Sequence, residues 1–595
     1  MLIDHDHVVI IGAGPAGLTA AYELVRRGIR PLVLERADKV GGLARTEIYK
    51  GFHFDLGGHR FFTKVGEVKK MWQEVLGEDL LLRPRLSRIY YDRRFFFYPI
   101  RPFNALFGLG FWQSLLIVLS YLRWQILPHR REDTFEQWVT NRFGGRLFLT
   151  FFKTYTEKVW GIPCSELRAE WAAQRIKDLS LRTTLLSIIM KPRTPIKTLI
   201  EQFHYPRRGP GMMWNGFKNE IERRGGVVHL NCDVSRISRT SSRIEGVAIS
   251  RDGREEVIRG TDFISSMPVT EFIKRLSPPP PPEVLQAAAK LTYRDFLTVC
   301  LIVDKPDLFP DNWIYVHDAS VKVGRIQNYK NWSPDMVPDH TKTSLGLEYF
   351  CTKGDVLWSM PDADLVELGK REVDHIGLAN YAEIEDGCVV RVPHAYPVYD
   401  SNYREHLAVV RKFVDSLENF QTIGRNGLHR YNNQDHAMLT GMLAVRNLCL
   451  AEQHDLWSVN TDQEYHEEIR DMAKVRDVAE VVEAALTRVF PKLDRVAFGL
   501  SLGTASGTLL FLATLWLVLK GGDVVGPNLQ LLSQYFPGYR VTAWGSLLGL
   551  VYAFMAGFIG GWVFAVLRNG VVLFYMAIIR RHAEFYHLRR LLEYL

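Results

Sequence analysis

The chain contains few cysteines, and their spacing excludes several kinds of site. Its 595 residues include six cysteines, none of which forms the C-x-x-C pair of zinc and dithiol sites. The sequence also has no His-rich group beside them. We therefore expect no bound metal and a reducing, cytosolic setting for the bulk of the chain.

Concentrated positive charge is also missing. The net charge of +8 comes from 74 Lys and Arg residues against 66 Asp and Glu residues, and the Arg clusters are short and scattered. A basic helix with interleaved aromatic residues, as in nucleic-acid sites, is not found. We expect no nucleic-acid partner. The surplus charge favours anionic membrane lipids and a phosphate-bearing substrate as partners.

Charge is absent from two stretches near the C-terminus. Phe498 to Leu519 is 22 residues without a charge, and Ala543 to Leu567 is 25. Each exceeds the roughly 20 residues that cross a bilayer core. Residues 498–567 are therefore predicted to form a transmembrane hairpin, the alternative being two buried core helices. The basic tail, 568–595, places both itself and the body of the chain in the cytoplasm by the positive-inside rule.

A third apolar stretch, Phe103 to Leu127, is interrupted by Gln113, Arg123 and Gln125. These polar side chains argue against a spanning helix. Two interpretations stay open, an amphipathic element at a membrane interface and a buried helix.

The N-terminal residues predict a strand, a glycine-rich turn and a helix. Val8 to Ile11 is a short apolar run, and Gly12, Gly14 and Gly17 follow it as G-x-G-x-x-G. In such a turn the first glycine permits the bend, the second admits a pyrophosphate and the third lets the helix pack on the strand. Because the apolar run leads directly into this turn, we expect no secretory signal.

A second predicted strand, Pro31 to Leu34, ends at Glu35, where an acid accepts hydrogen bonds from an adenosine ribose. Gly41 and Gly42 follow, with Arg45 and Thr46. This G-G-x-x-x-T continuation resembles the FAD-binding branch that contains amine oxidases, protoporphyrinogen oxidases, phytoene desaturases and UDP-galactopyranose mutases. The resemblance implies FAD as cofactor and Arg45 facing its phosphates.

Several later patches are similar to UDP-galactopyranose mutases. In the turn 57–63, Gly-Gly-His-Arg-Phe-Phe-Thr, the resemblance places His59 beside the isoalloxazine. In 155–161 it places Trp160 at the border of the substrate cleft. Tyr205-Pro206 resembles the return into the FAD domain, and Tyr396 lies in a Y-P-V motif near the sugar.

The segment that begins with Gly424-Arg425 resembles the C-terminal FAD motif of the branch, in which the arginine contacts FAD phosphate and the next helix points at the flavin. Here the sequence departs from the mutases. Their substrate-gripping tyrosines and acid are replaced by His429, Tyr431, Asn432 and Asn433. The departure leaves the FAD prediction intact and the substrate open.

Two sets of site residues follow from these patterns. The predicted cofactor-binding residues are Gly12, Gly14, Pro15, Ala16, Gly17, Glu35, Arg36, Gly41, Gly42, Leu43, Arg45, Thr46, Gly57, Gly58, His59, Val234, Gly424, Arg425, Asn433 and Asp435. The predicted catalytic or substrate-contacting residues are His59, Trp160, Arg325, Tyr396, His429 and Tyr431. Arg325 enters because a guanidinium can clamp a diphosphate with two hydrogen bonds.

The predicted fold class is α/β, with a Rossmann-type, glutathione-reductase-like FAD domain interleaved with a substrate domain, followed by the transmembrane hairpin. The expected segments are 1–95, 206–275 and 401–490 for the FAD domain and 96–205 and 276–400 for the substrate domain.

Two functions stay open. The first is a membrane-anchored enzyme of nucleotide-sugar, glycan or polyprenyl-linked sugar metabolism in the cell envelope, working by redox or mutase-like flavin chemistry. The second is an isoprenoid or tetrapyrrole oxidoreductase with a lipid substrate. The sequence indicates no particular redox partner.

Overall fold

The computed structural model describes residues 8–98, 104, 108–169, 202–251, 254–459, 493–521 and 526–592. The chain divides into two compact units, Met1–Ile469 and Arg470–Leu595, and each is described by itself. The predicted boundary at residue 490 and the last tail residues, 593–595, lie outside the described ranges.

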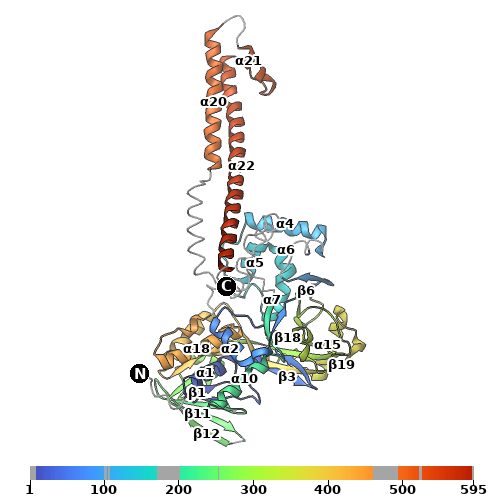
Figure 1. Ribbon diagram of the computed structural model, residues 1–595, viewed down its shortest axis with the longest axis vertical. Coiled ribbons are helices and arrows are strands. Elements are labelled where there is room, and N and C mark those ends of the chain that lie inside the picture. Colours follow the sequence, from blue (N-terminus) through green and yellow to red (C-terminus); the bar gives the residue numbers. More distant parts are fainter. Residues whose placement is uncertain are drawn as a thin grey trace. The chain divides into compact units, whose positions relative to one another are not determined.

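The first unit contains a five-stranded parallel sheet whose strands come from three separate stretches of the chain (Figure 1). Its order is β20 (Phe420–Thr422), β13 (Asp262–Ser265), β1 (Val8–Ile11), β2 (Leu32–Leu34) and β9 (Val227–His229). All four residues of β1 are buried, as expected for a central parallel strand with both faces covered. The sheet therefore confirms the α/β class expected from the sequence.

Three helices pack beside this sheet: α1 (Pro15–Arg26), α10 (Pro210–Arg223) and α18 (Gln434–Leu450). Helices α1 and α18 approach closely at Gly441, where a Cβ atom would lie 2.4 Å from the carbonyl oxygen of Ala16. The close approach brings residues from the start of the chain and from beyond residue 430 into one layer.

A four-stranded sheet lies at one end of this α/β part. Its order is β12 (Arg254–Arg259), β11 (Ile244–Arg251), β10 (Asp233–Arg239) and β14 (Leu276–Ser277). The strand-like stretch 227–237 does not form a single strand of this sheet. Instead, 227–229 form β9 of the parallel sheet, and only 233–239 enter the second sheet.

The other half of the first unit is built on a seven-stranded sheet. Its order is β19 (Ile384–Pro397), β15 (Tyr293–Val303), β18 (Thr343–Cys351), β17 (Arg325–Asn328), β16 (Trp313–Val316), β6 (Ser87–Tyr91) and β7 (Arg94–Phe97). Helix α15 (Asp362–Ile376) packs on it, and a helical group gathers nearby: α4 (Phe111–Ile126), α5 (Phe135–Phe143), α6 (Gly145–Phe148) and α7 (Thr154–Trp160).

Shorter elements connect the two halves. They are β3 (Thr46–Tyr49), β4 (Phe52–Asp55), α2 (Gly66–Leu76), β5 (Leu80–Pro84), β8 (Gln202–Pro206), α11 (Val269–Lys274), α12 (Pro282–Lys290), α16 (Tyr403–Val414) and α17 (Gly424–Gly427).

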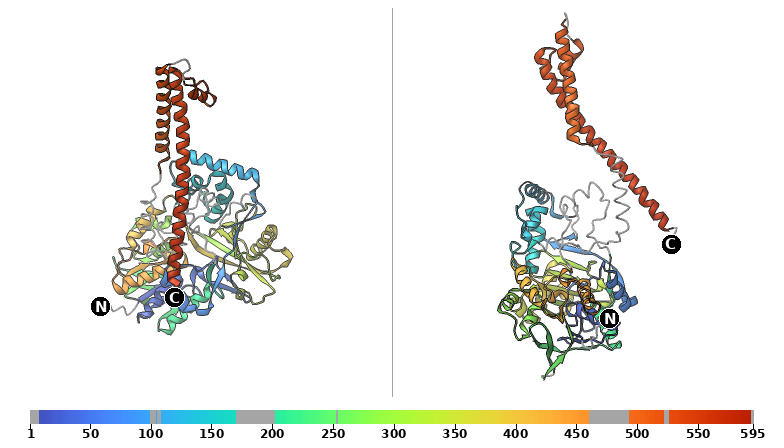
Figure 2. Two further views of the ribbon diagram at one scale, coloured as in Figure 1. Left: turned by 45° about the horizontal axis from the view of Figure 1, so that its top comes forward. Right: turned by 90° about the vertical axis from the view of Figure 1, so that its left-hand side faces the viewer.

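In the second unit, α20 (Arg495–Lys520) and α22 (Ala543–Leu592) lie side by side (Figures 1 and 2). Gly499, Gly503 and Gly507 recur every fourth residue of α20, and a Cβ atom at each would lie 2.8–3.0 Å from a backbone oxygen of α22. This small-residue spacing permits the tight contact seen between membrane helices.

Both helices are long and apolar enough to span a membrane by length and composition. Only 17% and 11% of the residues in their most apolar windows are buried, which disagrees with the alternative of two core helices. Helix α22 continues beyond the charge-free stretch that ends at residue 567 and reaches Leu592, so the predicted basic tail begins inside this helix. The letters Gly-Leu-Ser-Leu-Gly at 499–503 match a hydrolase nucleophile elbow, but Ser501 lies inside α20 and donates to the carbonyl of Ala497 at 2.8 Å.

Candidate active site

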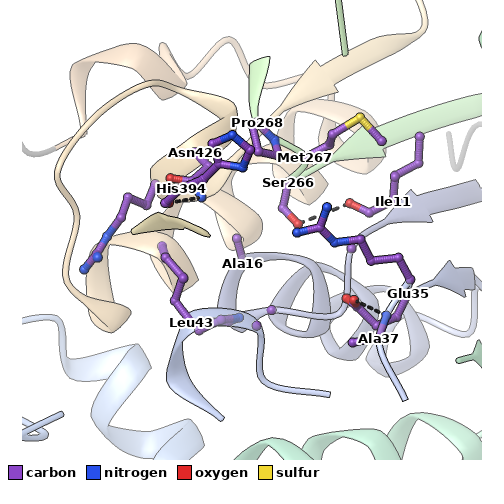
Figure 3. A pocket seen from close by; sticks show the side chains of 18 of the residues that line it. Ile11, Ala16, Glu35, Ala37, Leu43, Ser266, Met267, Pro268, His394 and Asn426 are labelled. Atoms are coloured by element: carbon purple, nitrogen blue, oxygen red, sulfur yellow. Dashed lines mark hydrogen bonds between the residues drawn. The ribbon is translucent and has the colours of Figure 1, made fainter. Parts of the chain in front are cut away.

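A cavity lies where the parallel strands β1, β2 and β13 end, beside the start of α1 (Figure 3). Its open space, mouth included, is about 1330 Å³. Residues from the three chain stretches that form the sheet line it, and residues of β10 and of the end of β19 close its sides. Ligands of α/β proteins bind at such carboxyl ends of parallel strands.

The glycine turn after β1 forms the floor of the cavity. Gly12 has φ +99°, and a Cβ atom there would lie 2.3 Å from Ser266 Oγ. A Cβ atom on Gly17 would lie 1.9 Å from the carbonyl oxygen of Gly12. Gly14 differs, since the nearest protein atom to its Cβ position is Gly42 Cα at 3.8 Å. Two glycines therefore serve packing, and Gly14 leaves space for a ligand.

Glu35 follows β2 and turns its carboxylate toward the glycine turn. Its Oε2 accepts a hydrogen bond from the amide of Ala13 at 2.7 Å. Its Oε1 accepts one from the amide of Ala37 at 2.9 Å (Figure 3). A carboxylate has four lone-pair sites, so two backbone bonds leave capacity for ribose hydroxyls. Its place on the cavity wall fits the adenosine end of a dinucleotide.

The second glycine pair brings Arg45 to the cavity. Gly42 has φ +53° and its Cα lies against Gly14. Arg45 donates through Nε to Glu47 at 2.6 Å and through a terminal nitrogen to the carbonyl of Gly42 at 3.2 Å. Thr46 does not line the cavity. Its hydroxyl accepts from the amide of Gly211 and donates to Asp55, which ties β3 to α10.

The far end of the cavity meets the N-terminus of α18. Asn433 caps this 17-residue helix in a capping box with His436, and Asn433, Gln434 and Ala437 line the wall. The starts of α1 and α18 therefore face one cavity, and their free N–H groups and positive dipole ends favour anionic groups there.

Arg425 lines the same wall but is held by backbone. Its Nε and one terminal nitrogen donate to the carbonyl of Asn432, at 2.9 and 2.7 Å, and its other terminal nitrogen donates to Ala395 at 3.0 Å. The resemblance implied a phosphate contact for this residue. In the structure its hydrogen bonds close the 425–432 loop onto β19, and the phosphate contact stays a prediction.

Most of the predicted cofactor residues line the cavity: Gly12, Gly14, Pro15, Ala16, Glu35, Arg36, Gly42, Leu43, Arg45, His59, Val234, Gly424, Arg425 and Asn433. Six lie outside the lining: Gly17, Gly41, Thr46, Gly57, Gly58 and Asp435. Gly57 and Gly58 instead pack against Arg325 and Gln327 of β17, and Asp435 is buried in the first turn of α18.

One side of the cavity is formed by Ser266, Met267, Pro268, His394 and Asn426 (Figure 3), and sequence reasoning missed all of these except His394. Ser266 donates to the carbonyl of Ile11 at 3.1 Å, and Asn426 donates to the carbonyl of His394 at 2.9 Å. The sequence signal for this third parallel strand is weak, because residues 262–265 read Asp-Phe-Ile-Ser and only two of the four are apolar.

The missed side also includes Arg275, which donates to Asp233 at 2.8 Å and to the carbonyl of Val234. Val234, one of the predicted cofactor-binding residues, therefore lies on the cavity wall with its carbonyl held by Arg275.

His59 lies on the cavity wall between the two halves of the first unit. It is half-buried, and its Nε2 donates to the carbonyl of Leu56 at 2.7 Å, which leaves a lone pair on Nδ1 of the neutral ring. Burial, together with the positive charges of Arg425 and Arg325, lowers the pKa of His59 to about 4. The imidazole is therefore neutral at cellular pH.

Arg325 projects from β17 and pairs with Glu348 of the neighbouring strand. Its Nε donates to Glu348 Oε1 at 2.8 Å and a terminal nitrogen donates to Oε2. Glu348 is fully buried and also accepts from Gln327 at 2.8 Å. This two-fold ion pair fixes the plane of the guanidinium, whose charge is also felt by Tyr155 and Tyr396.

Aromatic side chains gather around Arg325 and Arg425. The Tyr396 and Tyr431 rings stack with centroids 5.7 Å apart, and the Arg425 guanidinium lies 4.8 Å from the Tyr431 centroid. Trp160 is buried, and its ring centroid lies 6.1 Å from that of Tyr396, so it packs against this aromatic group. Four of the six predicted catalytic residues, counting Arg325, therefore belong to one cluster.

His429 lies elsewhere. Its side chain is 1% exposed and contacts the Tyr293 ring edge-on at 4.8 Å, and it is not part of the cavity lining. Burial lowers its pKa to about 4. We therefore assign His429 no ligand contact. Among the described residues, no group of three or more His, Cys, Asp or Glu side chains could hold a metal ion.

A glycine turn opening a helix, an acid after the next strand and a second helix N-terminus on one cavity define a dinucleotide-binding α/β protein. Comparison with known families is more specific. Residues 15–409 match the family of flavin containing amine oxidoreductases, and the chain belongs to it. Its cofactor is FAD, and the space left at Gly14 is where the pyrophosphate fits.

Relatives within this family differ in what they act on. The L-amino-acid oxidase of Bungarus fasciatus is 25% identical over 321 residues, covering 50% of this chain and 57% of that one. A 4,4'-diapophytoene desaturase of Methylomonas sp is 35% identical over 101 residues, covering 16% of this chain and 20% of that one. The chain thus spans just over half of the first relative and a fifth of the second.

Solved structures share the fold of the first unit. The reduced UDP-galactopyranose mutase superposes with a TM-score of 0.67 at 21% identity, covering 77% of this chain and 98% of that one. A protoporphyrinogen oxidase assignment from Exiguobacterium sp. 255-15 superposes with a TM-score of 0.59 at 16% identity, covering 76% of this chain and all of that one. At these identities the likeness concerns the fold alone.

Proposed function

We propose that this FAD-dependent enzyme acts on a sugar that carries a phosphate, as a nucleotide-sugar or a polyprenyl-linked sugar, in envelope glycan synthesis. The observation that carries the proposal is the convergence of two guanidiniums beside His59. Arg325 and Arg425 both lower the pKa of this histidine. Burial is the largest cause of that lowered pKa, and the two guanidiniums add to it. Their positive charge favours an anion bound at the same place.

The aromatic cluster supports a sugar at this position. Tyr155 and Tyr431 are half-buried beside the arginines, and Tyr155 contacts the Tyr315 ring edge-on with centroids 5.5 Å apart. Flat apolar faces with hydroxyl groups at their edges suit sugar rings and isoprenoid units alike.

The bound FAD supplies hydride transfer or, when reduced, a nucleophile for mutase-like chemistry. In either case the residues of this chain bind and orient the substrate. Arg325, with its plane set by Glu348, positions the phosphate. His59, through the lone pair on Nδ1, accepts a proton or a hydrogen bond at the reacting centre.

We further propose that α20 and α22 anchor the enzyme in a membrane, with the first unit on the cytoplasmic side. Support comes from their apolar length and from the arginines that follow residue 567. A lipid-linked substrate suits such an anchor.

Binding is tested with the purified full chain in detergent and FAD absorbance as the signal. We expect UDP or a short polyprenyl phosphate to perturb the flavin spectrum, and Arg325→Lys to weaken that affinity by roughly 10-fold or more, because a lysine cannot make the two-fold contact. Lys290→Ala on α12 is the control, since it removes a positive charge at an exposed position that does not line the cavity. Equal affinity in Arg325→Lys and the parent would refute the anion site.

A second candidate function is favoured by one comparison, the partial match to a carotenoid-precursor desaturase. In that case the substrate would be an isoprenoid without phosphate. The same titration separates the two functions, because a neutral isoprenoid would perturb the flavin equally in the parent and in Arg325→Lys.

A further inference from the structure

Helix α4 turns many large apolar side chains outward. The stripe turned into the protein contains Ser114, Ile117 and Tyr121, while the face turned outward contains Trp112, Leu115, Leu116, Leu119, Leu122 and Ile126. Trp112 and Ile126 are 73% and 75% exposed, and Leu119 is 52% exposed. A helix on an aqueous surface shows the opposite pattern, with its apolar stripe inward.

The polar side chains of α4 are used to hold it to the protein. Ser120 accepts from the amide of Arg146 at 3.1 Å, and Gln113 accepts from the Arg146 side chain at 3.1 Å. Gln125 donates to the carbonyl of Asn141 at 2.8 Å. These contacts orient the helix, so the outward apolar face is a built feature of the fold.

Close backbone packing holds the same orientation. Gly144 and Gly145 lie against Tyr121 and Trp124, and a Cβ atom on Gly144 would lie 2.8 Å from Tyr121 Cα. The inner residue Ile117 belongs to the same core as Trp160 and Tyr396. The helix is therefore a rigid outer wall of the group that carries the aromatic cluster (Figure 1).

Basic side chains surround the end of this apolar face. Arg123 is exposed on α4, and Arg130 and Arg131 are exposed directly after it. A leucine-rich face with tryptophan at one end and arginines at the other suits the boundary of headgroups and acyl chains. The same face suits the surface of a second protein less well, because that protein would need acidic side chains opposite the three arginines.

We propose that α4 lies in the membrane interface, with its leucine face in the acyl boundary and Arg123, Arg130 and Arg131 on anionic headgroups. The first unit would then touch the bilayer at a site separate from the α20–α22 hairpin. The inference draws on the proposed membrane anchor, since that anchor keeps the first unit near a bilayer.

The test uses the full-length FAD-loaded protein in nanodiscs of phosphatidylcholine and phosphatidylglycerol. Single cysteines carry an NBD fluorophore at Leu119→Cys on α4, at Leu509→Cys on α20 and at Val257→Cys on β12, all three being exposed positions. The unsubstituted protein reports labelling of the six native cysteines. Spin-labelled phospholipid quenches a fluorophore only when it lies in the lipid.

We expect quenching at 119 and 509 and none at 257. Omitting phosphatidylglycerol, or combining Arg123→Glu with Arg130→Glu, should reduce quenching at 119 and leave 509 unchanged. Quenching at 119 without quenching at 509 would support α4 docking and refute the hairpin. Quenching at 509 alone would overturn the α4 proposal and keep the hairpin. The α4 proposal would also be overturned if the NBD emission at position 119 were already shifted to blue in detergent and did not respond to lipid. In that case protein would cover the apolar face of α4.

Discussion

At the scale of single residues, His59 shows how its surroundings change what a side chain can do. As an isolated imidazole it would titrate near 6.5, within the range of cellular pH. Burial and the two guanidiniums lower its pKa to about 4. The resting imidazole is therefore neutral at cellular pH, and the lone pair on Nδ1 can accept a proton or a hydrogen bond.

Replacing His59 by alanine should keep FAD and most thermal stability but reduce turnover by roughly 10²-fold or more, the usual loss for a positioned proton-transfer group. Because the imidazole protonates only near pH 4, turnover that depends on it should not change around pH 6.5. Pre-steady-state reduction rates of parent and variant across pH measure both points. A parent inflection near 6.5 that disappears in the variant would contradict the lowered pKa.

Gly14→Val should abolish FAD binding without unfolding the protein. The nearest protein atom to the Cβ position is 3.8 Å away, so the chain tolerates the side chain, but the added methyls occupy the space of the pyrophosphate. Flavin content and circular dichroism of the purified variant are the measurements.

Gly17→Val is the matched control for that experiment. Its Cβ atom would lie 1.9 Å from the carbonyl oxygen of Gly12, so the variant should lose fold and flavin together. A folded Gly14→Val protein with a full complement of FAD would show that this turn does not hold the cofactor.

At the scale of elements, the site depends on two helices that begin at one cavity. Helices α1 and α18 come from opposite ends of the first unit and are held together where Gly441 meets Ala16. The contact aligns both N-termini with the cavity, although neither Gly441 nor its partner carries chemistry.

Gly441→Val should therefore weaken FAD binding from a distance. The side chain would force α18 away from α1 and shift Asn433 and Gln434 at its start, even though Gly441 does not line the cavity. We expect a lower thermal midpoint and at least a 10-fold weaker FAD affinity, about 1.4 kcal/mol. Leu443→Ala, a half-buried neighbour on the same helix, controls for general destabilisation. Unchanged FAD affinity with a lowered midpoint would contradict the role in alignment.

At the scale of the whole molecule, the division at residue 469 separates the catalytic unit from the apolar hairpin. Truncation after residue 492 should yield a soluble, yellow protein, while the full chain needs detergent, because α20 and α22 expose more apolar side chains than water tolerates. Gel filtration with absorbance at the flavin band measures this. If α4 also binds lipid, the truncated protein should still associate with anionic vesicles. Loss of FAD on truncation would place the hairpin within the catalytic fold.

Stability should also depend on pH in a defined direction. Burial lowers the pKa of His59 and His429 to about 4 and of His317 and His436 to about 3. An unfolded histidine protonates near 6.5, so below that pH the unfolded state binds more protons and folding stability falls. Burial raises the pKa of Asp55 to about 7, which acts in the opposite sense below pH 7 but involves one group.

The expected result is a falling thermal midpoint from pH 7 toward pH 5, with each buried histidine contributing up to about 1.4 kcal/mol per pH unit. His429→Gln, which is outside the cavity lining, should make the dependence on pH shallower. A midpoint that rises as the pH falls would mean that Asp55, and not the histidines, dominates.

The sequence by itself determined the cofactor, because the patterns that indicate it are local. The glycine turn, Glu35 and the Gly41-Gly42 pair each consist of neighbouring residues and can be recognised without the tertiary structure. It also determined the two apolar C-terminal helices, since their length and lack of charge are properties of consecutive residues. The length of α22 beyond residue 567 did not follow from this pattern, because a helix continues through charged residues as readily as through apolar ones.

Only the tertiary structure decided which distant residues share the site. Arg275, Ser266 and Asn426 reach the cavity through strand and loop positions that no local pattern relates to the glycine turn. It also separated His429 from Tyr431, which are two positions apart but lie in the core and in the cluster respectively. The outward apolar face of α4 also follows only from the tertiary structure. Composition shows that the helix is apolar, and packing decides which of its side chains face outward.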